Sequence, residues 1–405
     1  MTVSWAIQGS DTDPHYAALA AEFRPVFDRI REGAQRRELQ RELLHEPLAW
    51  LKAVRFGALR VPVEAGGYGV TLPHFFALLT ELSAADSNVT QALRGHFGFV
   101  ESVLASADAE KKQRWFARLE QGQWVGNAWS ELGEAKQGTF TTRIERDGEH
   151  YRLNGRKYYT TGSLYADWIN TGVSDEQGVW VNVVVDRHAP GVTVDDDWDG
   201  FGQRLTASGT THFQQVQVRA EELTRHEAAT SYEPAFYQLV HLATLTGIGL
   251  AAAQDVAEAV RTRTRSYSHG NAARAAQDPQ ILQVVGEVYS AVYGANAIVA
   301  QGARSLQHAW SATGKETSDS ANQQAELDIA QAQTVVSSLV LDAVTHLFDA
   351  LGASATATVQ GLDRYWRNAR TLVSHNPRVY KARIVGDYAV NGTAPGYQWR
   401  IGTVS

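Results

Sequence analysis

Residues 140–159 read FTTRIERDGEHYRLNGRKYY, and this stretch decides the fold class because it places β-hairpin chemistry between long helical segments. Two turn signals, Asp147-Gly148 and Asn154-Gly155, separate short runs in which apolar and polar residues alternate. Asp-Gly and Asn-Gly pairs favour tight hairpin turns because both residues tolerate the backbone angles that such turns require. We therefore predict antiparallel strands here, joined by two turns.

Strand patterns continue on both sides of this stretch. Residues 124–130 have an extended, aromatic pattern, residues 179–185 form a nearly continuous apolar run, and residues 210–218 form a further strand. A continuous apolar run is typical of a strand that is buried on both faces. The pattern predicts a compact antiparallel β-domain.

Helical periodicity dominates the rest of the chain. Near the N-terminus, apolar residues recur at the three- and four-residue spacing that places them on one helix face. These residues are Tyr16, Leu19, Phe23, Phe27 and Ile30. Residues 285–299 and 336–347 show the same spacing in longer segments, and we expect the polar stretch between them, residues 311–322, to be a loop.

The order is helices, then sheet, then helices, which predicts an α+β protein. We expect an N-terminal helical domain (residues 1–122), a central antiparallel β-barrel-like domain (residues 123–222) and a C-terminal four-helix bundle (residues 223–405). Residues 392–405 lack helical periodicity, and we expect this tail to pack on a neighbouring molecule.

Composition excludes several classes of function. Of the 405 residues, 44% are hydrophobic and 20% charged, and the net charge of −7 gives no basic footprint for nucleic acid or an anionic membrane. The absence of cysteine excludes disulfides and thiolate chemistry. The sequence shows neither a secretory signal pattern nor an apolar run that we judge long enough to span a bilayer, so we expect a cytoplasmic protein.

Residues 361–381, GLDRYWRNARTLVSHNPRVYK, contain the most informative local pattern. Pro377 forces Asn376 out of helical geometry, so His375 and Asn376 lie on a fixed turn between two helices. A polar pair on such a corner suits a functional site, although a surface turn would look the same.

Four stretches, in order and at their spacings, resemble the acyl-CoA dehydrogenase superfamily. They are PVEAGGYG at 62–69, NAWSE at 127–131, KYYTTG at 157–162 and LGAS at 351–354. The resemblance implies the acyl-CoA dehydrogenase-like fold. It also implies flavin contacts from the second and third stretches, and a loop in the fourth that reaches the flavin of a neighbouring subunit.

The corner at His375 departs from the dehydrogenase pattern. Dehydrogenases of this superfamily commonly place a Glu base there, in Tyr-Glu-Gly-Thr, whereas residues 375–378 read HNPR. Without a carboxylate, abstraction of an α-proton from an acyl thioester has no obvious base. Some relatives carry the Glu on another helix, so a displaced base remains open.

A closer resemblance is to two-component (group D) flavin-dependent monooxygenases of this fold, the dibenzothiophene monooxygenase group. It rests on residues 126–131, 154–162, 196–213, 261–265 and 363–381. It implies that a separate NAD(P)H-flavin reductase supplies reduced FMN, which reacts with O2 to a C4a-(hydro)peroxyflavin that oxygenates a substrate. FMN is favoured because the group uses FMN and no adenylate site is evident, but FAD stays possible.

By this resemblance, His375, Asn127 and Thr161 are the catalytic residues. His375 would lie near the C4a–N5 edge of the flavin, where an imidazole can donate or accept a proton near neutral pH. Asn127 and Thr161 would stabilise the oxygen adduct without adding a charge. The alternatives are a helix-capping histidine, an asparagine bonded along a strand edge and a threonine chosen for β-propensity.

The cofactor-binding residues implied by the resemblance lie in five segments. They are Asn127, Ala128, Trp129, Ser130, Glu131, Leu132, Tyr159, Thr160, Thr161, Arg265, Ala353, Ser354 and His375. Arg265 matches a phosphate-binding position, and a guanidinium pairs well with phosphate, although a solvated basic helix end is the alternative. Ala353 and Ser354 would reach the flavin from another subunit, which requires an oligomer; we expect a homotetramer.

Four residues are candidates for the substrate pocket. Trp198 matches a pocket-lining tryptophan, with a core tryptophan as the alternative. Gly95, followed by His96, and Leu372 replace larger or polar residues of sulfur-oxidising relatives, so the substrate cannot be carried across. No His-Glu-x-x-His or two-His-carboxylate pattern is present, and we expect no metal site.

The leading hypothesis is a two-component flavin monooxygenase that oxygenates a small organosulfur compound or an amine. The alternative is an acyl-CoA dehydrogenase or oxidase with a displaced catalytic base. A third hypothesis, a non-catalytic protein of this fold, predicts no oxygen-dependent chemistry.

Overall fold

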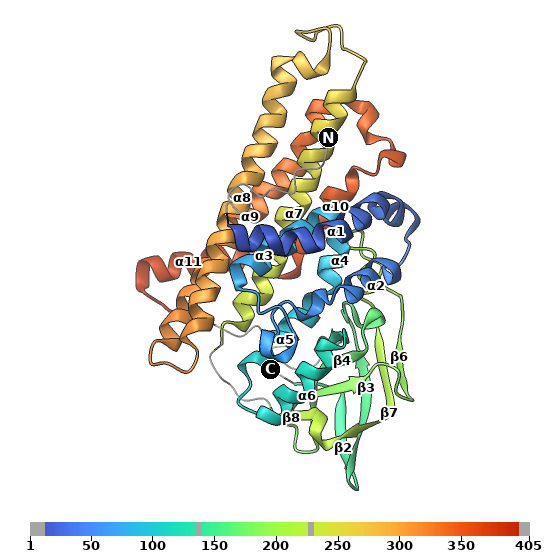
Figure 1. Cartoon of the computed structure of the whole chain (residues 1–405), viewed down its shortest axis with the longest axis vertical. Coiled ribbons are helices and arrows are strands. Elements are labelled where there is room, and N and C mark those ends of the chain that lie inside the picture. The colour runs from blue at the N-terminus through green and yellow to red at the C-terminus, as the bar shows by residue number, and fades with distance from the viewer. Residues whose placement is uncertain (1–12, 134–138, 226–230, 397–405) are drawn as a thin grey trace.

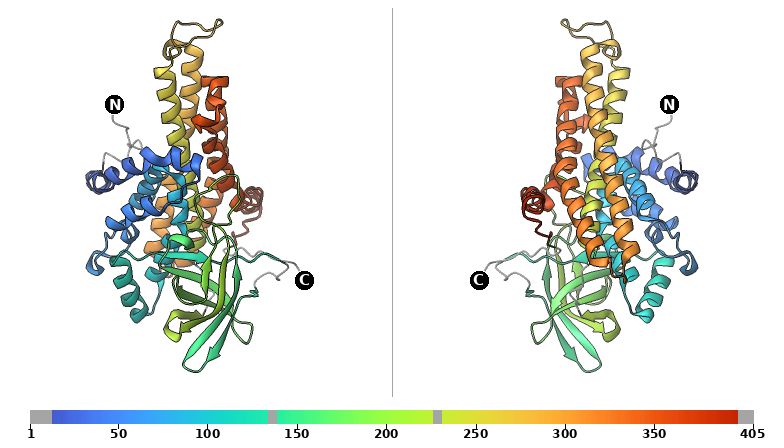
Figure 2. Two further views of the ribbon diagram at one scale, coloured as in Figure 1. Left: turned by 90° about the vertical axis from the view of Figure 1, so that its right-hand side faces the viewer. Right: turned by 90° about the vertical axis from the view of Figure 1, so that its left-hand side faces the viewer.

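The computed structural model describes residues 13–133, 139–225 and 231–396. A bundle of long helices forms the body, the N-terminal helices pack against one side of it, and the sheet lies at one end (Figures 1 and 2). The predicted order of helices, sheet and helices is confirmed. Most of residues 392–405, the predicted tail, lies outside the described residues.

Six α-helices precede the sheet. They are α1 (Pro14–Gln40), α2 (His45–Ala53), α3 (Leu72–Ala85), α4 (Ser87–Ala92), α5 (Arg94–Ala105) and α6 (Ala109–Glu120). The apolar face predicted for α1 is confirmed at Tyr16, Phe23, Phe27 and Ile30, which are at most 1% exposed. The Asp13 side chain caps this helix by accepting from the His15 N–H at 2.9 Å.

One sheet follows, in the order β6-β7-β3-β2-β4-β5-β8, with β1 paired to β4. Its strands are β1 (Val125–Ala128), β2 (Arg143–Asp147), β3 (His150–Lys157), β4 (Trp168–Ser174), β5 (Trp180–Asp186), β6 (Val192–Val194), β7 (Thr211–Arg219) and β8 (Leu223–Arg225). Most pairs are antiparallel, as predicted, but β1 runs parallel to β4, and β2 and β4 share one parallel pair. The sheet is therefore mixed. Strand β1 follows α6 in the chain, and no hairpin joins it to β4, the strand with which it pairs.

Only one of the two predicted hairpin turns exists. Asp147-Gly148 does turn the chain between β2 and β3. The prediction of a turn at Asn154-Gly155 is wrong, because this pair lies inside β3, where the register with β7 shifts. Gly155 (φ 150°) is needed for a close approach to Thr142, since a β-carbon there would lie 2.6 Å from Thr142 Cα. The pair marks a β-bulge, which also uses Asn and Gly chemistry.

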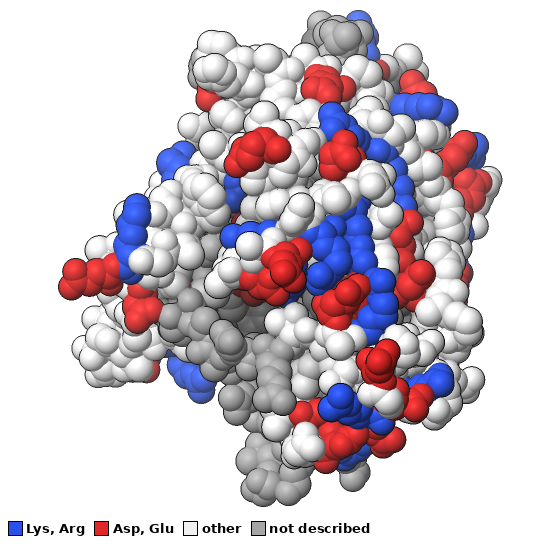
Figure 3. Space-filling view, turned by 60° about the horizontal axis from the view of Figure 1, so that its bottom comes forward, with Lys and Arg blue, Asp and Glu red and all other residues white. Residues whose placement is uncertain are grey.

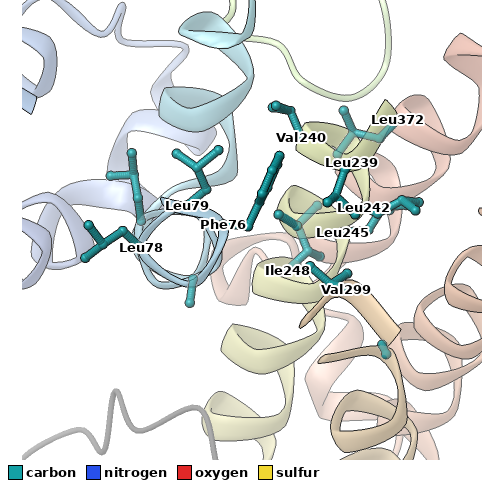
Figure 4. Close-up of a cluster of buried hydrophobic side chains, with 14 of the residues drawn as sticks. Phe76, Leu78, Leu79, Leu239, Val240, Leu242, Leu245, Ile248, Val299 and Leu372 are labelled. Carbon is teal, nitrogen blue, oxygen red and sulfur yellow. The ribbon is translucent and has the colours of Figure 1, made fainter. Parts of the chain in front are cut away.

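Five α-helices form the C-terminal region. They are α7 (Glu233–Thr262), α8 (Pro279–Ala312), α9 (Ser318–Leu351), α10 (Asp363–His375) and α11 (Val379–Asn391). The loop predicted over residues 311–322 spans only 313–317, because the polar residues on either side belong to α8 and α9. Helix α7 passes through the centre of the core, where Leu239 to Ile248 contact α3, α8 and α10 (Figure 4).

The expectation that no segment is long and apolar enough to span a bilayer is wrong, because two helices meet both criteria. Helices α7 and α9 pass both tests, with mean hydropathies of 1.3 and 1.4 over their most apolar windows. Those windows are 89% and 50% buried inside the molecule, which is typical of core helices. On the face drawn in Figure 3, Lys and Arg gather in a stripe near the middle, with Asp and Glu beside it.

Candidate active site

The corner that ends α10 is held by the two neighbouring helices. Helix α10 ends at His375, and Asn376 takes extended backbone angles (φ −118°, ψ 114°). The Asn376 side chain donates to Gln238 Oε1 at 2.7 Å, and its carbonyl accepts from Gln333 Nε2 at 2.8 Å. The predicted helix break before Pro377 is confirmed, and hydrogen bonds from α7 and α9 fix the corner.

The His375 ring lies against a second histidine. Its centroid is 4.4 Å from that of His241, with 69° between the ring planes. Loss of hydration, and then the charge of Arg94, lower the pKa of His375 to about 3, although part of the residue stays open to solvent. Burial and the same charge hold the pKa of His241 well below its usual range. Both rings are therefore neutral near pH 7, and each can donate one hydrogen bond and accept another.

Sequence reasoning missed His241 and Arg94. His241 is 1% exposed, its Nε2 lies 3.3 Å from Gln91 Nε2, and its Nδ1 has no partner within the described ranges. Arg94 lies over the Tyr237 ring, 4.7 Å from its centroid, and its Nε donates to the Tyr237 carbonyl at 3.1 Å. A histidine inside the apolar run of α7 was a usable signal, whereas nothing local distinguishes Arg94.

Asn127 contacts the first turn of α5. Its backbone carbonyl on β1 accepts from Ser163 Oγ at 3.0 Å. Its side chain packs so closely on Gly95 that a β-carbon there would lie 2.3 Å from Oδ1. Gly95, a predicted pocket residue, therefore forms the wall beside Asn127.

Thr161 lies beside the junction between α4 and α5. The next residue, Gly162, packs on Ala92, and a β-carbon at Gly162 would lie 2.0 Å from the Ala92 carbonyl oxygen. Arg94 belongs to the same junction, and its charge acts on His375. The structure thus brings Thr161, Asn127 and His375 around one short segment, residues 92–95.

The two predicted flavin-contacting segments lie side by side. The Tyr158 N–H donates to the Ser130 carbonyl at 2.9 Å, which joins residues 128–132 to residues 158–161. Ala128 and Thr160 in these segments are fully buried. Thr171 Oγ1 already donates to the Ala128 carbonyl at 2.6 Å, and the buried Thr160 Oγ1 donates to the Gly209 carbonyl at 3.0 Å. The Ala128 carbonyl and the Thr160 hydroxyl are therefore already used within the protein.

Glu131 has a structural role in this pair of segments. Its carboxylate accepts from Lys157 Nζ at 2.7 Å and from the Thr141 and Thr142 N–H groups at 2.7 and 3.0 Å. Burial alone would raise the pKa of Glu131, but the bonds from Lys157 and Thr141 lower it to about 2. Burial lowers the pKa of Lys157 to about 8, against the attraction of Glu131. This ion pair anchors the segment that carries Trp129 and Ser130.

Two of the predicted pocket residues lie in the core. The proposal of His96 as a substrate residue is wrong, because its Nε2 bonds to the Gly57 carbonyl at 2.9 Å and its Nδ1 accepts from the Val125 N–H at 3.2 Å. Burial lowers the pKa of His96 to about 4. Leu372 is 4% exposed and packs beside Leu239 of α7 (Figure 4). Adjacent positions on a helix face different directions, which explains why Gly95 reaches the site and His96 does not.

Comparison with known proteins identifies the family. Three profiles match, described as the N-terminal, middle and C-terminal domains of acyl-CoA dehydrogenase, over residues 15–123, 130–216 and 239–377. Dibenzothiophene monooxygenase of Mycolicibacterium goodii is 30% identical over 366 residues, which cover 85% of this chain and 87% of that protein. The chain belongs to the acyl-CoA dehydrogenase family.

Two solved structures of the acyl-CoA dehydrogenase fold match almost the whole chain. FMN-bound TdsC from Paenibacillus sp. A11-2 has a TM-score of 0.86 at 26% identity, covering 94% of this chain and 99% of its own. Methanesulfinate monooxygenase MsuC from Pseudomonas fluorescens has a TM-score of 0.86 at 25% identity, covering 93% and 98%. The proteins similar to this chain thus include monooxygenases of the family.

The residues beside Thr161 fit the flavin of such acyl-CoA dehydrogenase relatives. Tyr159 is 48% exposed, and its ring centroid is 6.0 Å from that of Trp198, whose Nε1 donates to the Gln203 carbonyl at 3.0 Å. At the start of α10, the end of that helix opposite His375, Phe201 and Trp366 stack with a centroid distance of 5.9 Å and are 54% and 40% exposed. Exposed apolar side chains beside neutral polar groups suit an isoalloxazine, which has apolar faces and polar edges.

The remaining predicted cofactor residues lie at the other end of the bundle. Arg265 follows the end of α7, where Arg263 Nη1 donates to the Leu351 carbonyl at 2.5 Å, and Ala353 and Ser354 come directly after. From His241 to the end of α7 the helix rises by about 30 Å, at about 1.5 Å per residue. Within one chain, these three residues cannot contact a ligand held at His375.

Neither of two cavities found in the described ranges coincides with this site. One of about 170 Å³ lies between α1, α4, α7 and α10, and one of about 200 Å³ lies beside Phe348 and Thr356. The first is lined by charged groups that already pair, including Arg31 and Arg364 with Asp255. No cluster of three or more potential metal ligands occurs within residues 13–133, 139–225 and 231–396.

Proposed function

We propose that this protein is the oxygenase component of a two-component flavin-dependent monooxygenase. It takes reduced FMN from a separate NAD(P)H-flavin reductase and oxygenates a small organosulfur compound or an amine. When bound, reduced FMN supplies two electrons to O2, so that one oxygen atom enters the substrate and the other leaves as water. By their names, the similar monooxygenases act on both a neutral thioaromatic and an anionic sulfinate, so those names leave the charge of the substrate open.

The observation that carries this proposal is that no carboxylate is among the groups that act on His375 in the described part of the chain. The groups that shift its pKa include Arg94 and Asn376 but no carboxylate. A dehydrogenase needs a base that accepts an α-proton, and this corner offers no carboxylate for that task. Neutral donors instead suit oxygen transfer, because they bind a reduced oxygen species without supplying the proton that releases hydrogen peroxide.

The chain's own residues have separate tasks in this proposal. His375 hydrogen-bonds at the reacting edge, and its position relative to α7 and α9 is fixed by the Asn376 contacts to Gln238 and Gln333. Asn127 and Thr161 hold the opposite side of that edge. Trp198 and Tyr159 exclude water from one face.

The site is completed by a neighbouring copy in this proposal. Arg265 would bind the phosphate of FMN, and Ala353 and Ser354 would contact the flavin, from a second subunit, because they lie about 30 Å from His375 along α7. We propose a cytoplasmic homotetramer with domains at residues 1–122, 123–222 and 223–405. Light scattering tests the assembly, and a monomer with full activity would contradict it.

The test of function supplies reduced FMN and O2 to the purified protein with sulfides, thiophenes, sulfinates, indoles and primary amines. We expect one class to yield an oxygenated product with consumption of reduced FMN, and His375→Ala to divert the electrons to hydrogen peroxide. Bleaching of bound oxidised flavin by an acyl-CoA, with no oxygenated product, would instead establish the dehydrogenase alternative. Hydrogen peroxide as the sole product of every mixture would indicate a protein without oxygenase function.

A further inference from the structure

Arg94 is a half-buried cation for which the described chain provides no anion. Two buried arginines and one half-buried arginine each pair with a carboxylate: Arg37 with Asp86 at 2.9 Å, Arg60 with Glu101 at 2.7 Å, and the half-buried Arg118 with Glu222 at 2.8 Å. Within the described ranges, Arg94 makes one hydrogen bond, from Nε to the Tyr237 carbonyl. Its two terminal nitrogens keep their donors free.

The structure keeps this cation in place. The guanidinium covers the Tyr237 ring, which supplies a cation–π contact but no negative charge. The Tyr237 ring in turn fills a space left by Gly98, where a β-carbon would lie 1.9 Å from Cζ. Burial lowers the pKa of Arg94 to about 10, and Tyr237 is the neighbour that opposes this shift. At neutral pH the side chain remains charged.

The groups around Arg94 are polar and neutral. Tyr237 and His241 lie one turn apart on α7, and Arg94 acts on both His241 and His375 through its charge. Gly95, the residue after Arg94, contacts the Asn127 side chain. That side chain makes no hydrogen bond with the described part of the chain. One cation among neutral donors, without a carboxylate, is the chemistry of an anion site.

We propose that Arg94 binds the anionic group of the substrate, so that the substrate is a small organosulfur oxyanion, such as a sulfinate, rather than a neutral sulfide or an amine. The inference rests on the proposed oxygenase function. The two terminal nitrogens pair with two oxygens of the anion and direct its sulfur toward His375 and Asn127. Oxygenation then adds one oxygen atom to the sulfur lone pair, the second leaves as water, and reduced FMN supplies the two electrons. An amine cation would be repelled from this position.

Matched probes separate charge from shape. Methanesulfinate carries a negatively charged oxygen where dimethyl sulfoxide carries a second methyl group. Both compounds have a sulfur atom that can be oxidised. Benzenesulfinate and methyl phenyl sulfoxide repeat the comparison at larger size. We expect the wild-type protein to oxygenate the anion of each pair with a kcat/KM about tenfold to a hundredfold higher, the usual effect of a charge-assisted pair.

The variants locate this selectivity. In Arg94→Met the ratio of kcat/KM for the anion to kcat/KM for the sulfoxide should fall by about tenfold or more, and Arg94→Lys should retain a preference for the anion because it keeps the charge. Arg304→Gln is the control, since Arg304 is exposed on α8 and bonds only to Gln301. Equal oxygenation of both probes by the wild-type protein would overturn the proposal. An equal decrease in kcat/KM for both probes in Arg94→Met would also overturn it, because it would indicate that Arg94 interacts with the flavin rather than with the substrate.

A binding measurement separates this proposal from the proposed function. Calorimetry without turnover compares methanesulfonate with dimethyl sulfone on the protein with oxidised FMN. Tighter binding of the anion to wild type than to Arg94→Met supports the anion site even if no oxygenation is ever observed. Undetectable or equal binding overturns it, even if oxygenase activity is found. Circular dichroism and thermal unfolding verify the fold of each variant, and the wild-type probe pair decides the matter if Arg94→Met does not fold.

Discussion

Gly98 of α5 and Tyr237 of α7 are in such close contact that a β-carbon on Gly98 would lie 1.9 Å from Cζ and 2.1 Å from the hydroxyl oxygen of the tyrosine. The ring cannot move away freely, because the Arg94 guanidinium covers it. Helices α5 and α7, which carry Arg94 and His241, can pack this closely at the candidate site because Gly98 has no side chain.

Gly98→Ala should therefore destabilise the protein by about 1–3 kcal/mol, the usual cost of overpacking. Urea unfolding provides the measurement. Gly286→Ala is the matched control, because Gly286 also lies inside a helix and a β-carbon there would meet no atom within 4 Å. That control should be stabilised by roughly 0.5–1 kcal/mol through lower chain entropy. Equal effects of the two changes would show that α5 and α7 do not pack as described.

Gly95→Ala should impair oxygenation more than stability. The new methyl group would lie 2.3 Å from Asn127 Oδ1, and the asparagine side chain would have to rotate away from the site. We expect a larger share of hydrogen peroxide per reduced FMN consumed, with thermal unfolding close to that of wild type. Unchanged coupling between FMN oxidation and product would contradict the role proposed for Asn127.

Glu131→Gln should cost about 3–5 kcal/mol, because it leaves Lys157 as a buried charge without its partner. The two side chains are 6% and 0% exposed. The double variant Glu131→Gln, Lys157→Met should recover a large part of this loss. Denaturant unfolding of the three proteins measures the coupling, and additive effects would show that the pair contributes nothing beyond its separate groups.

Glu326 makes stability depend on pH near neutrality. This residue of α9 is 3% exposed, and burial, against the charge of Lys381, raises the pKa of its carboxyl from 4.5 to about 7. The folded state then binds more protons than the unfolded state between these values, so stability should fall as pH rises through this window. Burial also raises the pKa of Glu233 to about 7, so Glu326→Gln should remove only the share of the loss that belongs to Glu326, and Glu258→Gln, at an exposed glutamate, should leave the slope unchanged. Urea unfolding from about pH 5 to pH 8 measures both slopes, and parallel slopes for Glu326→Gln and wild type would contradict the assignment.

Local patterns predicted the elements well because periodicity and helix-breaking residues act over a few positions. The apolar spacing of Tyr16 to Ile30 and the break at Pro377 both survive in the structure. Asn154-Gly155 was misread because a turn and a bulge use the same residues, and only the pairing with β7 distinguishes them. His96 and Arg94 show the same limit at the site. Whether Gly95 or His96 faces the site depends on how α5 packs. Arg94 contacts Tyr237, which lies far from it in the sequence, so no local pattern marks it.

The length of α7 implies that two inactive variants of this protein can complement each other. It places Arg265 about 30 Å from His375 in one chain, so on the proposed assembly each working centre is built from two molecules. A population carrying only His375→Ala, or only Arg265→Gln, would have every centre damaged. Mixed after unfolding and reassembled together, the two inactive proteins should regain part of the wild-type rate, since some centres would then receive an intact half from each parent.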